Sequence, residues 1–203
     1  NWIVAGVGDL ALKVKVYAFN TFLFCLMISV ALSMATEVII AQRVGRNEFA
    51  EADRQMRHSL KVAIWGTGLL ALLWVVLNQQ MLGIYTDDPA ILAFGFWVFV
   101  LAFLSEPART VNIVMGAALR STGDAAFISY STIAVIWLFS VPLAYVLTIT
   151  LGWGIYGVMS AEIVDESVRA AIKWWRWRKG HWKEYGVAAR EAREAKRRNL
   201  MDQ

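Results

Sequence analysis

The amino-acid sequence predicts an all-α membrane protein, a multipass bundle of transmembrane helices. Of its 203 residues, 58% are hydrophobic and 18% are charged, whereas a soluble domain has about 45–50% apolar residues and about a quarter charged residues. The apolar residues form long blocks, and residues 16–36 and 62–86 contain no charged side chain. Because a helix needs roughly 20 apolar residues to cross a bilayer, each of these blocks is long enough to span it.

Two further apolar blocks supply three more predicted spans. Residues 89–119 are apolar apart from Glu106 and Arg109, and residues 125–161 form a block that is too long for one helix and divides at Gly152-Trp153-Gly154. The last span is the weakest on hydropathy. The five predicted spans cover residues 16–41, 62–84, 89–119, 126–149 and 152–174. They form a partial transmembrane lobe over residues 1–175, and a basic tail follows over residues 176–203.

The first connection has the residue types of a helix end followed by a new helix start. Gly45 can adopt the left-handed conformation that often ends a helix. Asn47 is a preferred N-cap residue, and Glu48 and Glu51 would lie at the positive end of the next helix dipole. We therefore expect a tight elbow between the first two spans.

Two prolines, Pro107 and Pro142, lie inside the third and fourth predicted spans. Proline lacks a backbone N–H and its ring displaces the carbonyl four residues earlier, so it bends a helix. We expect a kink at both positions.

The distribution of Lys and Arg predicts the orientation of the spans, because these residues are enriched in cytoplasmic connections. The second and fourth connections contain no Lys or Arg. The first carries Arg43, Arg46, Arg54, Arg57 and Lys61, the third carries Arg120, and the tail is strongly basic. This alternation predicts a cytoplasmic C-terminus, with the N-terminus outside. We expect the protein to lie in the plasma or inner membrane. Since the chain begins with Asn1 and has no basic leader, we expect it to be a fragment preceded by an upstream segment.

Tryptophans alternate with cations over residues 173–182. Interleaved aromatic and basic residues can bind single-stranded nucleic acid. Directly after a span, the same pattern is typical of an interfacial anchor, with indoles at headgroup level and cations on anionic lipid. We favour the anchor, which makes the lipid bilayer rather than nucleic acid the expected partner.

The third span carries a polar segment at membrane depth. An ionisable side chain there costs a few kcal/mol unless it faces a partner or a cavity. Arg109 follows Glu106 at i+3, and Asn112 lies three residues further along the same face. Two interpretations remain open: an internal ion pair that stabilises a kinked helix, or a Glu106 carboxylate that binds a proton or cation and changes state during transport.

The last span holds a second polar set. Asp165 and Arg169 have the i,i+4 spacing of an ion pair, and Glu166 and Arg169 have the i,i+3 spacing. We interpret these three as structural partners. At about 1.5 Å per residue, Glu162 lies near the middle of the bilayer, where a carboxylate is a candidate for coupling to an ion or proton. We rank it below Glu106.

The sequence gives little support for a metal site or an enzyme active site. Cys25 is the one cysteine, and His58 and His181 are far apart, so no metal site is expected. The sequence contains no nucleotide-binding glycine loop and no nucleophile–base motif, which argues against an enzyme or a resident cofactor. Asn20 and Thr21, in the first span, could line a cavity, although small polar residues more often serve helix packing.

Four segments resemble the multidrug and toxic-compound extrusion (MATE) family of transporters, and they follow one another along the chain in the family's order. Leu119-Arg120-Ser121-Thr122-Gly123-Asp124 is similar to the ending of the family's tenth span, and Trp153-Gly154 with Gly157 is similar to the opening of its twelfth. Residues 32–52 resemble the end of span eight and its elbow, with Ala41 where a glycine is common, and residues 85–88 resemble the turn after span nine.

The resemblance implies spans 8–12 of a twelve-helix transporter, that is, part of its C-terminal lobe without the N-terminal lobe. It further implies an antiporter that exports cationic or amphipathic small molecules in exchange for Na⁺ or H⁺, through a cavity between two lobes. Some members use an aspartate on span ten in the cation site, and Glu106 lies at or near that position.

Two alternatives to drug export stay open. One is a flippase for lipid-linked precursors or polysaccharides in the same superfamily. A large basic cavity would favour this alternative, whereas the charge at membrane depth in this sequence is more acidic than basic. The other is a membrane scaffold that transports nothing, in which the charges at membrane depth only neutralise one another.

Overall fold

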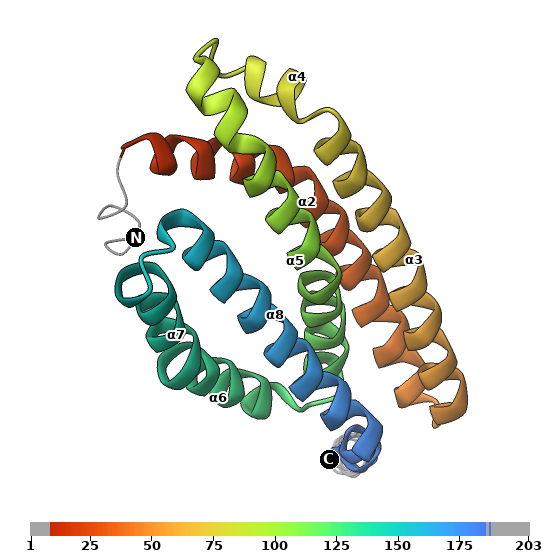
Figure 1. Ribbon diagram of the computed structural model, residues 1–203. Helices are drawn as coiled ribbons and strands as arrows, with labels where there is room; N and C mark the ends of the chain where they lie inside the picture. The colour runs from red at the N-terminus through yellow and green to blue at the C-terminus, as the bar shows by residue number, and fades with distance from the viewer. Residues whose placement is uncertain (1–8, 186, 188–203) are drawn as a thin grey trace, which may run out of the picture.

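The computed structural model describes residues 9–185 and 187, and all the regular structure in that part of the chain is helical (Figure 1). The first half comprises α2 (Asp9–Gly45), α3 (Phe49–Val76), α4 (Asn78–Gly83) and α5 (Pro89–Ser121). The second half comprises α6 (Ala125–Val135), the π-helical turn η1 (Ile136–Ser140), α7 (Val141–Tyr145), a second π-helical turn η2 (Val146–Thr150) and α8 (Gly154–Lys179).

Four of the described helical segments are long and apolar enough to cross a membrane, namely Leu12–Gly45, Phe49–Val76, Pro89–Ser121 and Ala125–Thr150. They correspond to the first four predicted spans and confirm an all-α multipass membrane protein. The fifth predicted span is helical as α8. Because of its charged residues, α8 is not among the helices that are apolar enough to span a membrane. That α8 crosses the membrane therefore stays a prediction.

The second predicted span, 62–84, is not one uninterrupted helix. Leu77 separates α3 from α4, with φ −92° and ψ 19°. The side-chain amide of Asn78 donates to the carbonyl oxygen of Val75 at 2.7 Å. An amide that bonds to nearby backbone in this way competes with regular helix geometry, which accounts for the local distortion.

The elbow between α2 and α3 differs from the prediction. The left-handed residue is Asn47, with φ 62°, and not Gly45. Gly45 continues α2, and Glu48 occupies the N-cap position of α3 without a side-chain cap bond. Because Asn tolerates positive φ better than most residues, the chain turns at Asn47 itself, which prevents Asn47 from capping.

The two prolines act differently. Pro107 lies inside a continuous α5, whose axis changes direction along its length in Figure 1. Pro142 is the second residue of α7, which lies between the two π-helical turns. The side-chain oxygen of Ser140 lies 3.1 Å from the carbonyl oxygen of Val135, five residues earlier. The fourth predicted span is therefore a helix with widened turns on both sides of its proline.

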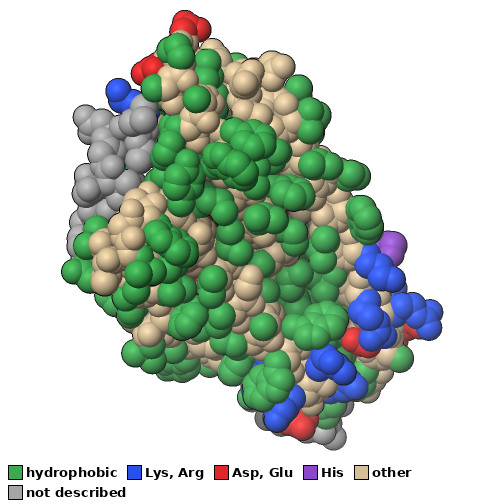
Figure 2. All heavy atoms as spheres, in the orientation of Figure 1, with side chains coloured by type: hydrophobic (Ala, Val, Ile, Leu, Met, Phe, Trp, Pro, Cys, Tyr) green, Lys and Arg blue, Asp and Glu red, His purple; other side chains and the backbone are tan. Residues whose placement is uncertain are grey.

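Helix α5 lies at the centre of the bundle and packs against α2, α3 and α8, whereas the segment from α6 to η2 packs chiefly against α8 (Figure 1). Much of the face in Figure 2 is apolar, and most of its Lys and Arg side chains gather at one end. The α2–α3 and α5–α6 connections lie at that end, and the α4–α5 connection lies at the other.

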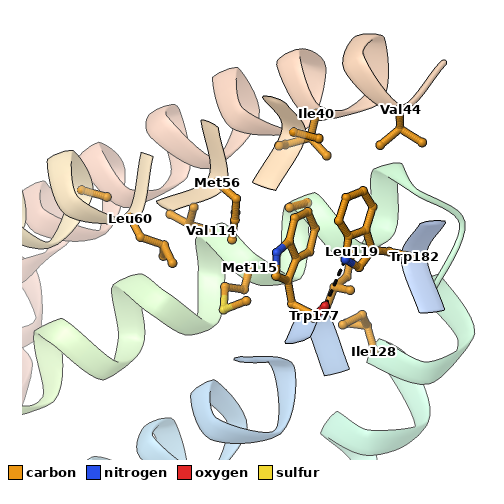
Figure 3. Close-up of a cluster of buried hydrophobic side chains, with 13 residues drawn as sticks. Ile40, Val44, Met56, Leu60, Val114, Met115, Leu119, Ile128, Trp177 and Trp182 are labelled. Atoms are coloured by element: carbon orange, nitrogen blue, oxygen red, sulfur yellow. Dashed lines mark hydrogen bonds between the residues drawn. The ribbon is translucent and has the colours of Figure 1, made fainter. Parts of the chain in front are cut away.

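A cluster of buried apolar side chains lies at the cationic end of the bundle (Figure 3). Trp177 of α8 and Trp182 are 4% and 1% exposed, and their rings stack at 4.4 Å. The chain reverses at Gly180, which has φ 80°, and the indole N–H of Trp182 donates to the carbonyl of Trp177 at 3.0 Å. These two tryptophans are core residues and not interfacial anchors.

Trp174 and Trp175 keep the exposure that an interfacial anchor requires, at 39% and 50%. The remainder of the predicted basic tail, from residue 188 onward, lies outside the described residues.

Candidate functional site: a buried charge network between α5 and α8

Glu106 lies at the centre of the bundle and is 0% exposed. It is one turn before Arg109 on α5, which confirms the pairing expected from their spacing. Its Oε1 atom accepts a hydrogen bond from the Nη1 group of Arg109. Its Oε2 atom is buried and has no hydrogen-bond partner among the described residues. A buried carboxylate oxygen without a partner is costly, so this atom marks a place where a proton or cation would be stabilised.

The guanidinium of Arg109 contacts three carboxylates. Besides Glu106, its Nη2 group donates to Oε1 of Glu162, and its Nε atom lies 3.8 Å from Oε1 of Glu166. Both of these carboxylates belong to α8. A planar guanidinium with five donors is suited to such sharing and stays protonated. Arg109 therefore joins the predicted candidates of two separate spans into one network.

Asn112 extends the network by one turn of α5. Its amide N–H donates to Oε2 of Glu166 at 2.7 Å. The ammonium of Lys173 donates to the Asn112 side-chain oxygen and, at 3.1 Å, to its backbone carbonyl. Asn112 thus holds two charges of opposite sign from α8.

Lys173 is the residue that sequence reasoning misplaced. The basic pattern of residues 173–182 suggested a headgroup-facing cation, but Lys173 is 7% exposed. The spacing of Lys173 could have indicated its burial. Glu166, Arg169 and Lys173 follow one another at intervals of three and four residues, so they lie on one face of α8.

Asp165 forms a second branch of the network. It pairs with Arg169, as its spacing predicts, and accepts a hydrogen bond from Ser140. Arg169 also lies 3.6 Å from Glu166. Ser140 was not among the predicted site residues. It connects the π-helical turn η1 to the charges of α8.

A chain of hydroxyls lies in the same region of the bundle. The hydroxyl of Thr110 on α5 is 3.1 Å from that of Ser29 on α2 and 2.9 Å from that of Thr67 on α3. Thr67 also donates to the carbonyl of Ala63 at 2.8 Å. These bonds tie the three helices together at the depth of the charged network.

A cavity of about 230 Å³ opens beside the network, between α2 and the charged faces of α5 and α8. Arg109, Glu162 and Glu166 contribute its charges, and Phe19, Phe22, Leu23 and Leu26 contribute the apolar wall. Asn20 and Thr21 are not among its lining residues: Asn20 is exposed, and Thr21 donates to the carbonyl of Tyr17 at 3.0 Å.

The fold and the buried charges together define a polytopic helical membrane protein with a polar network at bilayer depth, a combination that marks ion and substrate pathways. A family model described as MatE matches residues 1–146. The chain therefore belongs to the MatE family of transporters.

Curated relatives agree with this membership. The chain is 31% identical to the "Uncharacterized transporter YisQ" of Bacillus subtilis over 191 aligned residues. The aligned region makes up 93% of this chain and 41% of that protein. The chain is 28% identical over 178 residues to a "Probable multidrug resistance protein NorM" of Mannheimia succiniciproducens, covering 86% and 38%. A protein of the same name from Pasteurella multocida is 29% identical over 133 residues, covering 66% and 29%. The chain spans about two fifths of the length of the first two.

Proposed function

We propose that this chain is part of a secondary active antiporter in the cell membrane, with a cytoplasmic C-terminus. The antiporter exports cationic or amphipathic small molecules in exchange for H⁺ or Na⁺. The names of the NorM relatives support multidrug export as the substrate class. A second lobe would complete the transport cavity.

The unpaired oxygen of Glu106 is the observation that carries the coupling proposal. The network contains the carboxylates Glu106, Glu162, Asp165 and Glu166 and the cations Arg109, Arg169 and Lys173. When all are ionised, negative charge exceeds positive charge by one. One proton or one monovalent cation at Glu106 would neutralise this excess.

Arg109 would transmit the change in charge from α5 to α8. When Glu106 is neutral, its attraction for the guanidinium falls, and Glu162 and Glu166 hold Arg109 more strongly toward α8. An ion changes the balance between inward-open and outward-open states only if it binds them with different affinity. The sharing of Arg109 supplies a physical basis for that difference.

The substitution Glu106→Gln tests the proposal, because it keeps the side-chain size and removes the charge. In proteoliposomes of the protein made from its complete coding sequence, we expect dye export to lose its dependence on an imposed pH or Na⁺ gradient. Glu184→Gln is the matched control, since Glu184 lies outside the network and is 80% exposed at its side chain. Unchanged gradient dependence in Glu106→Gln would remove Glu106 from the mechanism. Absence of flux in the unsubstituted protein would favour a scaffold.

A further inference from the structure

A cavity of about 400 Å³ lies at the cationic end of the molecule, between the start of α3 and the end of α8. Its cationic lining residues are Arg57, Arg178 and Lys183. Trp174, Trp177 and Trp182 supply its aromatic walls. This cavity is separate from the charge network, because it shares no lining residue with the cavity beside Arg109.

The described residues do not balance the positive charge of this cavity. Asp53 is its one acidic lining residue, and its carboxylate is already engaged by Arg57 at 2.7 Å and by the indole N–H of Trp177 at 2.9 Å. Arg178 and Lys183 form no ion pair with any carboxylate among the described residues; Lys183 lies 5.5 Å from the centre of the Trp182 ring. Within the described part of the chain, the cavity therefore offers an anion two cations that have no carboxylate partner.

An apolar surface continues from the cavity along α3. Arg57 and Lys61 are followed at the same helical spacing by Trp65 and Leu69, which are 70% and 61% exposed. Cationic side chains lie next to apolar surface at this end in Figure 2. A ligand that fits both features carries a negative headgroup on an apolar chain.

We propose that this cavity binds the phosphate headgroup of an anionic phospholipid, with its acyl chain along Trp65 and Leu69. Arg guanidinium matches phosphate oxygens through paired hydrogen bonds, and Lys adds a compact positive charge. A lipid bound in this way fastens the start of α3 to the end of α8, next to the stacked Trp177 and Trp182.

Native mass spectrometry of the delipidated protein in detergent, titrated with phosphatidylglycerol or phosphatidylcholine, tests the proposal. We expect retained phosphatidylglycerol and little phosphatidylcholine. In the double variant Arg178→Gln/Lys183→Gln, phosphatidylglycerol affinity should fall roughly 30-fold, since each cation near anionic lipid contributes about a factor of five. The matched control is Arg46→Gln/Lys179→Gln, which removes the same two charge types from exposed positions outside the cavity.

Three outcomes would overturn the site. Equal weakening in the control variant would mean that only the overall positive charge attracts the lipid. Unchanged affinity in Arg178→Gln/Lys183→Gln would place the lipid elsewhere. Displacement of phosphatidylglycerol by millimolar inorganic phosphate, with phosphate itself retained, would show that the cavity recognises free phosphate and not a lipid.

Discussion

Asn112 shows how much one uncharged residue contributes to the site. Its amide group donates to Glu166, and its oxygen atoms accept from Lys173. Both charged partners are largely buried, so neither can exchange Asn112 for bulk water at no cost. A single amide thereby satisfies the hydrogen-bonding demand of an acid and a base from the neighbouring helix.

We predict that Asn112→Leu destabilises the protein by about 2–3 kcal/mol, because two buried charged groups each lose a hydrogen bond. Denaturant unfolding in detergent micelles, followed by tryptophan fluorescence, measures the change. Asn78→Leu is the control, since Asn78 is buried to a similar extent but, among the described residues, its side chain donates only to the carbonyl of Val75. It should cost about 1 kcal/mol. Equal losses in the two variants would contradict the proposed role of Asn112.

Sequence spacing predicts contacts between residues of the same helix but not contacts between different helices. The pairs Glu106–Arg109 and Asp165–Arg169 followed from their positions on one helix face. The contact between Arg109 and Glu162 joins residues 53 positions apart and exists only because α5 packs on α8. The burial of Lys173 has the same origin. Local sequence thus identifies the charged residues but not their partners across helices.

Two helical segments approach each other closely at Gly157, near the start of α8. A Cβ atom at this position would lie 2.7 Å from the carbonyl carbon of Leu147 and 2.8 Å from the backbone nitrogen of Thr148. These are backbone atoms of η2, which cannot move aside as a flexible side chain can. Small residues commonly permit such contact between membrane helices.

We predict that Gly157→Ala separates α8 from η2 and costs about 1–3 kcal/mol through overpacking. The thermal midpoint of unfolding in detergent should fall accordingly. Gly66→Ala is the matched control, because no described atom beyond the neighbouring backbone of its own helix lies within 4 Å of a Cβ atom at Gly66. In that part of α3, alanine should be neutral or stabilising by up to about 1 kcal/mol. A midpoint for Gly157→Ala at or above that of Gly66→Ala would refute the close-contact argument.

At the level of elements, the apolar blocks and Pro142 predicted where helices lie and where one is distorted. The type of distortion did not follow from the sequence, because a proline predicts a bend but not the π-helical turns that flank it here. The buried Trp177 and Trp182 were mistaken for an interfacial anchor. Their stacking requires the chain reversal at Gly180, which the aromatic–basic pattern does not encode.

Across the whole molecule, the connections alternate between two ends of the bundle, and the basic ones share an end (Figures 1 and 2). The Lys and Arg content of the connections predicts the same arrangement from the sequence alone. Hydropathy and charge suffice here because a bilayer permits few ways to arrange apolar helices.

We predict that the end carrying the α4–α5 turn is extracellular. In a Cys25→Ser background, a membrane-impermeant maleimide should label Asp87→Cys in intact cells. It should label Arg46→Cys only after permeabilisation, because that residue lies in the positively charged elbow. Both native positions are exposed, so accessibility within the protein does not limit the reaction. Labelling of both variants in intact cells would invalidate the alternating topology.

The exposure of the segment Ala125–Thr150 affects which substitutions it can tolerate. Most of this segment is exposed, with Trp137 at 68% and Leu138 at 80%, and it packs chiefly on a single neighbour. Its outer positions can exchange one apolar residue for another at little cost, whereas Ser140, bonded to Asp165, has no such freedom. We therefore expect substitutions on the outer face of this helix to cost little stability, whereas loss of the Ser140 hydroxyl removes a hydrogen bond to a buried carboxylate.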